Sequence, residues 1–66
     1  MKSIITVQDN SIGKMYIVIP KIRDVHKAFG NVVISIDNGD KITIEADDSE
    51  KQINEILEAI EEFYQK

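Results

Sequence analysis

Few residues in this chain have the side chains that catalysis requires, and their spacing does not match a catalytic set. His26, the single histidine, lies two positions after Asp24 and could act in proton transfer or anion binding, because histidine titrates near neutral pH. No cysteine is present, and no serine with the turn chemistry of a nucleophile lies near His26. We therefore expect a surface histidine in a protein that is not an enzyme and uses no cofactor.

Metal binding has little support in the residue types. The absence of cysteine and the single histidine exclude thiolate sites and paired-histidine zinc sites. Asp37, Asn38 and Asp40 superficially suggest a calcium loop, but the ligand spacing of an EF-hand is missing. The same residue types are those that a tight turn needs, so we expect a turn here and no metal.

A basic cluster, Lys21, Arg23 and Lys27, could contact nucleic acid. Nucleic-acid binders combine such clusters with exposed aromatic side chains or a recognition helix. The nearby aromatic residue, Phe29, is expected in the core, and the chain has a net charge of −4. Direct nucleic-acid binding is therefore less supported than a solvated basic face.

The last third of the chain is acidic, with eight acidic residues against two lysines from residue 45 onward. The preceding residues carry six basic and four acidic side chains, so +2 and −6 add to the net charge of −4. Four glutamates are expected on the solvent face of a helix: Glu55, Glu58, Glu61 and Glu62. Like charges at helical spacing repel by a few tenths of a kcal/mol, which favours a docking surface or a phosphate-mimicking row as an alternative to simple solvation.

The elements that position these residues follow from the apolar pattern. Four short runs rich in β-branched residues predict two β-hairpins: 2–8 with 15–19, and 32–36 with 41–46. In the second hairpin, a three-residue turn at 37–39 places Ile34 opposite Ile42 and aligns both apolar faces. That turn requires a positive φ at Gly39.

The C-terminal segment predicts a helix, because its apolar residues repeat at helical spacing: Ile53, Ile56, Leu57, Ile60, Phe63 and Tyr64. Its start is marked by capping-box spacing, either Ser49 with Gln52 or Asp47 with Glu50. Residues 20–30 fit two interpretations. Helical spacing of Ile22, Val25 and Phe29 favours a short helix, whereas alternation of charged and apolar residues also fits a fifth strand.

These elements predict one α+β domain over residues 1–66: a four-stranded antiparallel sheet of two hairpins, with the amphipathic helix packed on one face. A short helix or fifth strand would connect the hairpins. Six side chains should face the helix: Ile17, Ile19, Val32, Ile34, Ile42 and Ile44. Four should lie on the opposite face: Ile4, Tyr16, Val18 and Val33. That face is too apolar to be left in water, so the 20–30 segment, a second copy or a partner should cover it.

The expected function is binding without catalysis: a small bacterial or phage protein that binds and regulates or inhibits another protein. The expected contact residues are Tyr16, Val18 and Val33 together with the four glutamates. One alternative is an acidic nucleic-acid mimic that blocks a DNA- or RNA-binding protein, and another is weak nucleic-acid binding through the basic cluster. We also expect self-association through the apolar face. The lack of cysteines, of a signal segment and of a membrane-spanning run favours a cytoplasmic protein.

Overall fold

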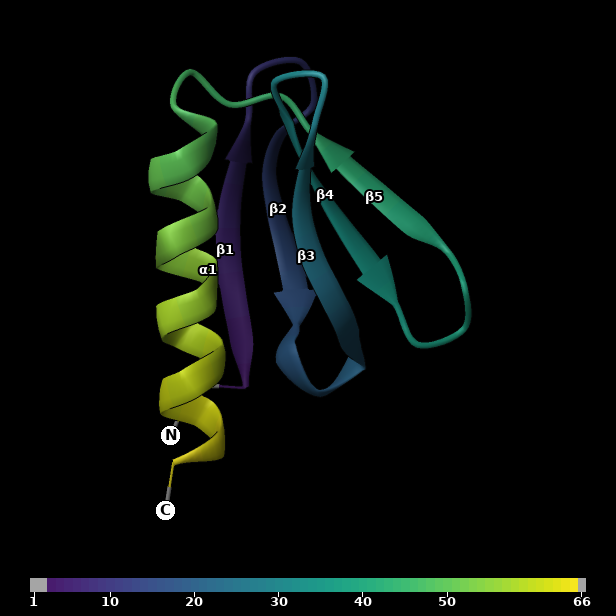
Figure 1. The fold of residues 1–66 in the computed structure, drawn as a ribbon, viewed down its shortest axis with the longest axis vertical. Helices are drawn as coiled ribbons and strands as arrows, with labels where there is room; N and C mark the ends of the chain where they lie inside the picture. The colour runs from purple at the N-terminus through teal and green to yellow at the C-terminus, as the bar shows by residue number, and fades with distance from the viewer. Residues whose placement is uncertain (1–2, 66) are drawn as a thin grey trace.

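The computed structural model describes residues 3–65, which form five strands, a short 3₁₀ turn and one α-helix (Figure 1). The elements in chain order are β1 (Ile4–Asp9), β2 (Gly13–Val18), η1 (Ile19–Lys21), β3 (Ile22–Ala28), β4 (Asn31–Ile36), β5 (Lys41–Ile44) and α1 (Ser49–Tyr64). The strands form two antiparallel sheets, β1-β2 and β3-β4-β5. The predicted α+β class and C-terminal helix are confirmed, whereas the single four-stranded sheet is wrong.

The 20–30 segment is the fifth strand rather than a helix, with Pro20 in the 3₁₀ turn that precedes it. Ile22 and Val25 are three residues apart, a spacing that places side chains on opposite faces of a regular strand. A β-bulge between Ile22 and Asp24 inserts an extra residue, so both apolar side chains pack against the core. The three-residue spacing of Ile22 and Val25 therefore results from the bulge in β3 and not from a helix.

The second hairpin has the predicted register. Ile34 lies opposite Ile42 and Val32 opposite Ile44, and Gly39 has a φ of 99°. The apolar side chains of β4 and β5 therefore share one face. This is the register that a three-residue turn produces, whereas a two-residue turn would shift the pairing by one residue.

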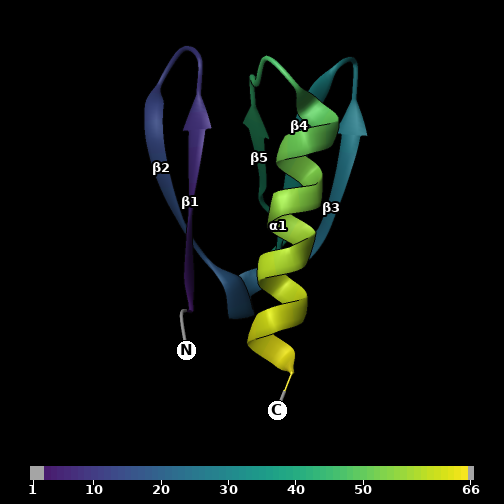
Figure 2. The same cartoon turned by 90° about the vertical axis from the view of Figure 1, so that its left-hand side faces the viewer.

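The core lies between the two sheets and α1. It contains six buried side chains: Val7, Ile17, Val32, Ile34, Ile44 and Ile56. On α1, only Ile56 of the predicted apolar stripe is fully buried, while Leu57 and Tyr64 are exposed. Figure 2 shows why, since the helix crosses the three-stranded sheet while the β1-β2 hairpin stands to one side.

The helix begins differently from both predicted capping boxes. Asp48 is the N-cap residue, and its carboxylate accepts a hydrogen bond of 3.1 Å from the backbone N–H of Lys51. The Ser49 hydroxyl instead donates to the carbonyl of Gly30 in the β3–β4 turn. The start of α1 is therefore attached to the end of the three-stranded sheet.

Asp9 connects the two sheets and is buried, although the sequence suggested only a turn residue. Its carboxylate accepts three backbone hydrogen bonds, from Ser11 (2.8 Å), Ile12 (2.7 Å) and Glu45 (2.7 Å). These bonds, first of all the one from Glu45, hold the pKa of Asp9 below its usual range, against the opposing effect of burial. The charged carboxylate thus joins the end of β1 to the chain that leaves β5.

Neighbouring polar residues reinforce this junction. The Asn10 backbone N–H donates to the Glu45 carbonyl at 2.8 Å, and the Asn10 side chain donates to Asp47 at 3.0 Å. The Ser11 hydroxyl donates to the Glu45 carboxylate at 2.8 Å. We call these contacts between residues 9–11 and 45–47 the loop clasp. In Figure 1 it lies at the upper end of the molecule.

Within residues 3–65, no helix is long and apolar enough to cross a membrane.

Candidate functional site

The β1-β2 hairpin presents an exposed apolar surface, which we call the hairpin face: Ile4, Tyr16 and Val18. Their exposed fractions are 48%, 69% and 45%. Ile4 lies directly opposite Val18, and Tyr16 is the next outward residue on β2. Side chains this close across an antiparallel pair form one contiguous patch.

Strand parity explains the hairpin face. Val7 and Ile17 point into the core and are buried, so the residues that alternate with them must point outward. β2 is paired only with β1 in the described part of the chain, which leaves one side of Tyr16 and Val18 without a neighbouring strand. The predicted outward orientation of the three residues is therefore confirmed, and none of them is covered by residues 20–30.

Val33, which was expected to join them, lies in the other sheet and is only 7% exposed. It is on the central strand β4, between His26 on β3 and Thr43 on β5. Side chains on both flanking strands cover it, which is not possible for Tyr16 on an edge strand. The split of the sheet thus removes Val33 from the candidate surface.

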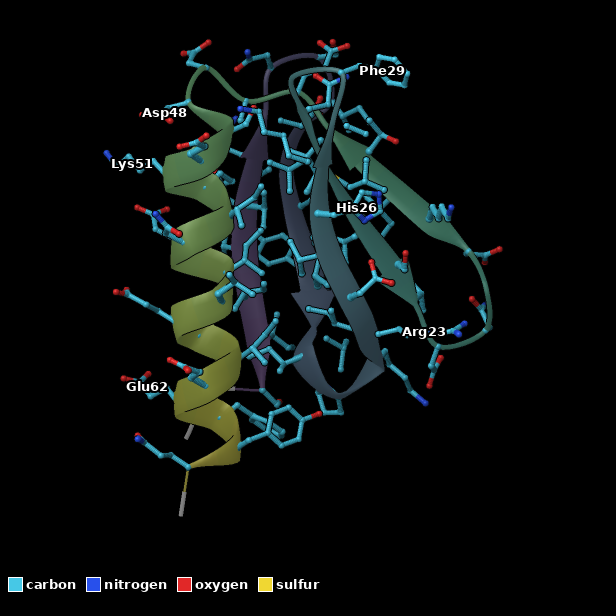
Figure 3. The ribbon with its side chains drawn as sticks, viewed as in Figure 1. Arg23, His26, Phe29, Asp48, Lys51 and Glu62 are labelled. Carbon is cyan, nitrogen blue, oxygen red and sulfur yellow. The ribbon has the colours of Figure 1, made fainter. Side chains whose placement is uncertain are left out.

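The four glutamates of α1 are all exposed: Glu55, Glu58, Glu61 and Glu62. Among residues 3–65, no ion pair involves any of them. Figure 3 shows the Glu62 side chain projecting away from the strands, on the same side of α1 as Lys51. The helix therefore presents a largely uncompensated acidic surface.

The basic cluster is dispersed by the fold. Lys21 lies 3.8 Å from the Asp37 carboxylate at the end of the β4–β5 hairpin. Lys27 lies 3.3 Å from Glu50 in the first turn of α1. These two cations are therefore each paired with an acid on a different element, and neither pair includes Arg23.

His26 and Asp24 do lie together, with His26 Nδ1 3.1 Å from Asp24 Oδ1. The hydrogen bond with His26 lowers the pKa of Asp24, and a hydrogen bond from Ser35 lowers it further. Ser35 faces Asp24 across β3 and β4 and is a neighbour that the sequence did not suggest. However, the carboxylate stands between the serine and the histidine, so the histidine is not placed to take the serine proton as in a catalytic triad.

Two further apolar side chains are exposed at the clasp end, and the sequence did not identify them. Phe29 is 103% exposed and has a φ of 53°, in a two-residue turn with Gly30. Figure 3 shows its ring pointing away from the molecule. The prediction that Phe29 is in the core is wrong because β3 ends at Ala28, and Phe29 with Gly30 forms the turn that leads to β4. Ile12 is 73% exposed in the β1–β2 turn.

Two small grooves separate β1 from α1, and both include Gln52 and Glu55. The larger has a volume of about 260 Å³ and is lined mostly by polar side chains. Small-molecule sites are usually apolar and about 300–1,000 Å³, so neither groove has the character of a substrate site. In the described part of the chain, no three His, Asp or Glu side chains gather as metal ligands would.

Comparisons with protein-family models, with curated proteins and with solved structures found no match to this chain. Its function must therefore be inferred from its own surfaces.

Proposed function

We propose that this protein is a non-catalytic module that binds another protein and thereby regulates or inhibits it, and that it docks through the hairpin face. The observation that supports this most directly is the contiguous exposure of Ile4, Tyr16 and Val18 on one side of the hairpin. Single exposed apolar residues are common on protein surfaces, but a contiguous cluster that includes an aromatic residue is typical of an interface core.

The size of the hairpin face sets the strength of this contact. Covering these three partly exposed side chains removes roughly 300 Å² from water and contributes about 7 kcal/mol at about 25 cal/mol per Å². Association itself costs about 4–15 kcal/mol, so the partner must gain more than one hairpin face alone provides. We therefore expect an apolar partner surface that also contacts residues around the patch.

The test compares capture of proteins from a lysate of the native host by three immobilised variants. Val18→Asp should abolish capture of the specific partner, because a buried carboxylate without a counter-charge costs more than the lost contact. Thr43→Asp is the matched control, since it adds the same charge to an exposed strand position of the other sheet. Glu58→Gln/Glu62→Gln should leave capture unchanged, and capture should depend weakly on salt.

A second candidate function is a nucleic-acid mimic, which the uncompensated glutamates of α1 favour. Such a protein would bind the basic groove of a DNA- or RNA-handling protein, with association steered by charge and reduced by salt. Loss of capture with Glu58→Gln/Glu62→Gln and retention with Val18→Asp would support this alternative and contradict docking through the hairpin face.

A further inference from the structure

We propose that two copies of this chain pair along β2, so that the two hairpins form one continuous four-stranded sheet around a two-fold axis at Tyr16. The proposal depends on the open edge of β2 and not on the proposed function.

The open edge follows from the hydrogen-bond parity of the hairpin. The Ile19 backbone N–H donates to the Ser3 carbonyl at 2.7 Å, one residue before the first pair of the ladder, Ile4 with Val18. In an antiparallel ladder, alternate residue pairs exchange hydrogen bonds. The N–H and C=O groups of Tyr16 and Val18 therefore point away from β1, as do those of Lys14.

Four strands have an unpaired side in the described part of the chain, β1, β2, β3 and β5, and the edges of β3 and β2 differ in how they are protected. β3 contains a bulge and is rich in charged and ionisable side chains, Arg23, Asp24, His26 and Lys27, and these features discourage the addition of another strand. β2 is a regular strand over Gly13–Val18 without proline, and its only charged residue is Lys14. Natural proteins normally protect exposed strand edges against pairing with another chain. Because β2 lacks the protective features that β3 has, its edge indicates a surface for pairing.

The sequence of β2 is compatible with its own antiparallel copy. With the axis at Tyr16, Lys14 faces Val18 of the second copy, and Met15 faces Ile17. No charged side chain then lies opposite another of the same sign, and the inward residues extend both cores. The three pairs whose N–H and C=O groups point outward each exchange two hydrogen bonds, which adds about six backbone hydrogen bonds between the copies.

The charge distribution is also compatible with this contact. Figures 1 and 2 both place β1 between α1 and β2, so the acidic helix lies away from the pairing edge. Two copies can therefore join along β2 while their acidic helices remain apart. The pairing also brings the two hairpin faces onto one surface, which doubles the apolar area that a partner protein could contact.

Disulfide trapping tests the register, because the natural chain has no cysteine. Opposed Tyr16→Cys residues should have Cα atoms about 5.5 Å apart, within the range for a disulfide. Lys14→Cys is the matched control on the same strand and face. Its two thiols lie four strand positions apart across the axis, about 13 Å, which is too far to bridge. A mixture of Lys14→Cys with Val18→Cys should give the mixed dimer.

We expect Tyr16→Cys to form a covalent dimer at least about tenfold faster than Lys14→Cys, as the geometry requires. Equal rates for the two variants, together with no mixed dimer from Lys14→Cys and Val18→Cys, would overturn the register. The mixture of Lys14→Cys with Val18→Cys retains the Tyr16 ring in both copies. It therefore tests the same register even if loss of that ring weakens association of the Tyr16→Cys variant.

Sedimentation from micromolar to near-millimolar concentration tests the assembly itself. The wild type should shift toward twice 7.5 kDa as concentration rises. Lys14→Pro should remain monomeric and folded, because the N–H that it removes points away from β1 and is not used within the hairpin. A wild type that remains monomeric throughout, or a Lys14→Pro variant that dimerises equally, would refute pairing along β2. Lys14→Pro leaves the hairpin face intact, so loss of the dimer can be distinguished from loss of partner binding.

Discussion

Replacing Ile56 by alanine should remove a large share of the stability of this fold. Ile56 is 2% exposed and packs in the core with residues from both sheets, among them Ile17 and Ile44. Truncating a buried isoleucine to alanine costs about 2–5 kcal/mol, because apolar contacts are lost and a cavity remains. A domain of this length has a total stability of about 3–10 kcal/mol, so the change approaches complete unfolding at the lower end.

Urea unfolding followed by circular dichroism measures this effect. With an m-value near 1 kcal/mol per M for so small a domain, the midpoint should fall by about 2 M or more. Leu57→Ala is the matched control on the adjacent residue, and its 44% exposure predicts a cost below about 1 kcal/mol. Ile60→Ala should lie between them, because Ile60 is half-buried. Equal costs at Ile56 and Leu57 would refute the orientation of α1 described above.

Three further changes test the ends of the elements. Asp9→Asn should destabilise the fold at neutral pH, because an amide cannot accept all three backbone N–H groups. Because folding lowers the pKa of Asp9, its contribution to the free energy of unfolding is complete above about pH 4 and is lost as pH falls through the folded-state pKa. The melting temperatures of the wild type and Asp9→Asn should therefore converge in acid. A constant difference between them down to about pH 2 would contradict this assignment. Phe29→Asn should stabilise the fold by up to about 1 kcal/mol, because asparagine tolerates a positive φ better than phenylalanine; a loss of stability on thermal melting would mean that the ring packs against the protein. Asp48→Ala should cost about 1 kcal/mol through loss of the N-cap, and Glu58→Ala at an exposed position of the same helix much less, so equal melting temperatures of the two variants would exclude Asp48 as the cap.

The sequence was sufficient for features that depend on local periodicity. The length of the turn at 37–39 determined the register of β4 and β5, because only one parity aligns their apolar faces. The spacing of apolar residues in α1 indicated a helix, although it did not show that the sheet covers only the side around Ile56.

Features that depend on contacts between distant segments were not predictable in this way. Because of the bulge after Ile22, the apolar residues of β3 have a spacing in the sequence that resembles that of a helix. This spacing favoured the prediction that Phe29 is in the core, whereas Phe29 is exposed. The burial of Asp9 depends on the Glu45 amide, which is 36 positions away. For the same reason, strand parity identified the hairpin face at Tyr16 but could not reveal that Val33 belongs to a separate sheet.

The topology also has a consequence for how the chain folds. Within residues 3–65, every strand pairs only with a neighbour in sequence, so each sheet can form by closing short loops at small entropic cost. The loop clasp, in contrast, must bring residues 9 and 45 together across the intervening strands. We therefore expect the two sheets to form first and to dock in a later, slower step. The Glu45 amide reports on this step, and its hydrogen exchange should be faster than that of the Ile34 amide within β4; slower exchange would argue against late docking.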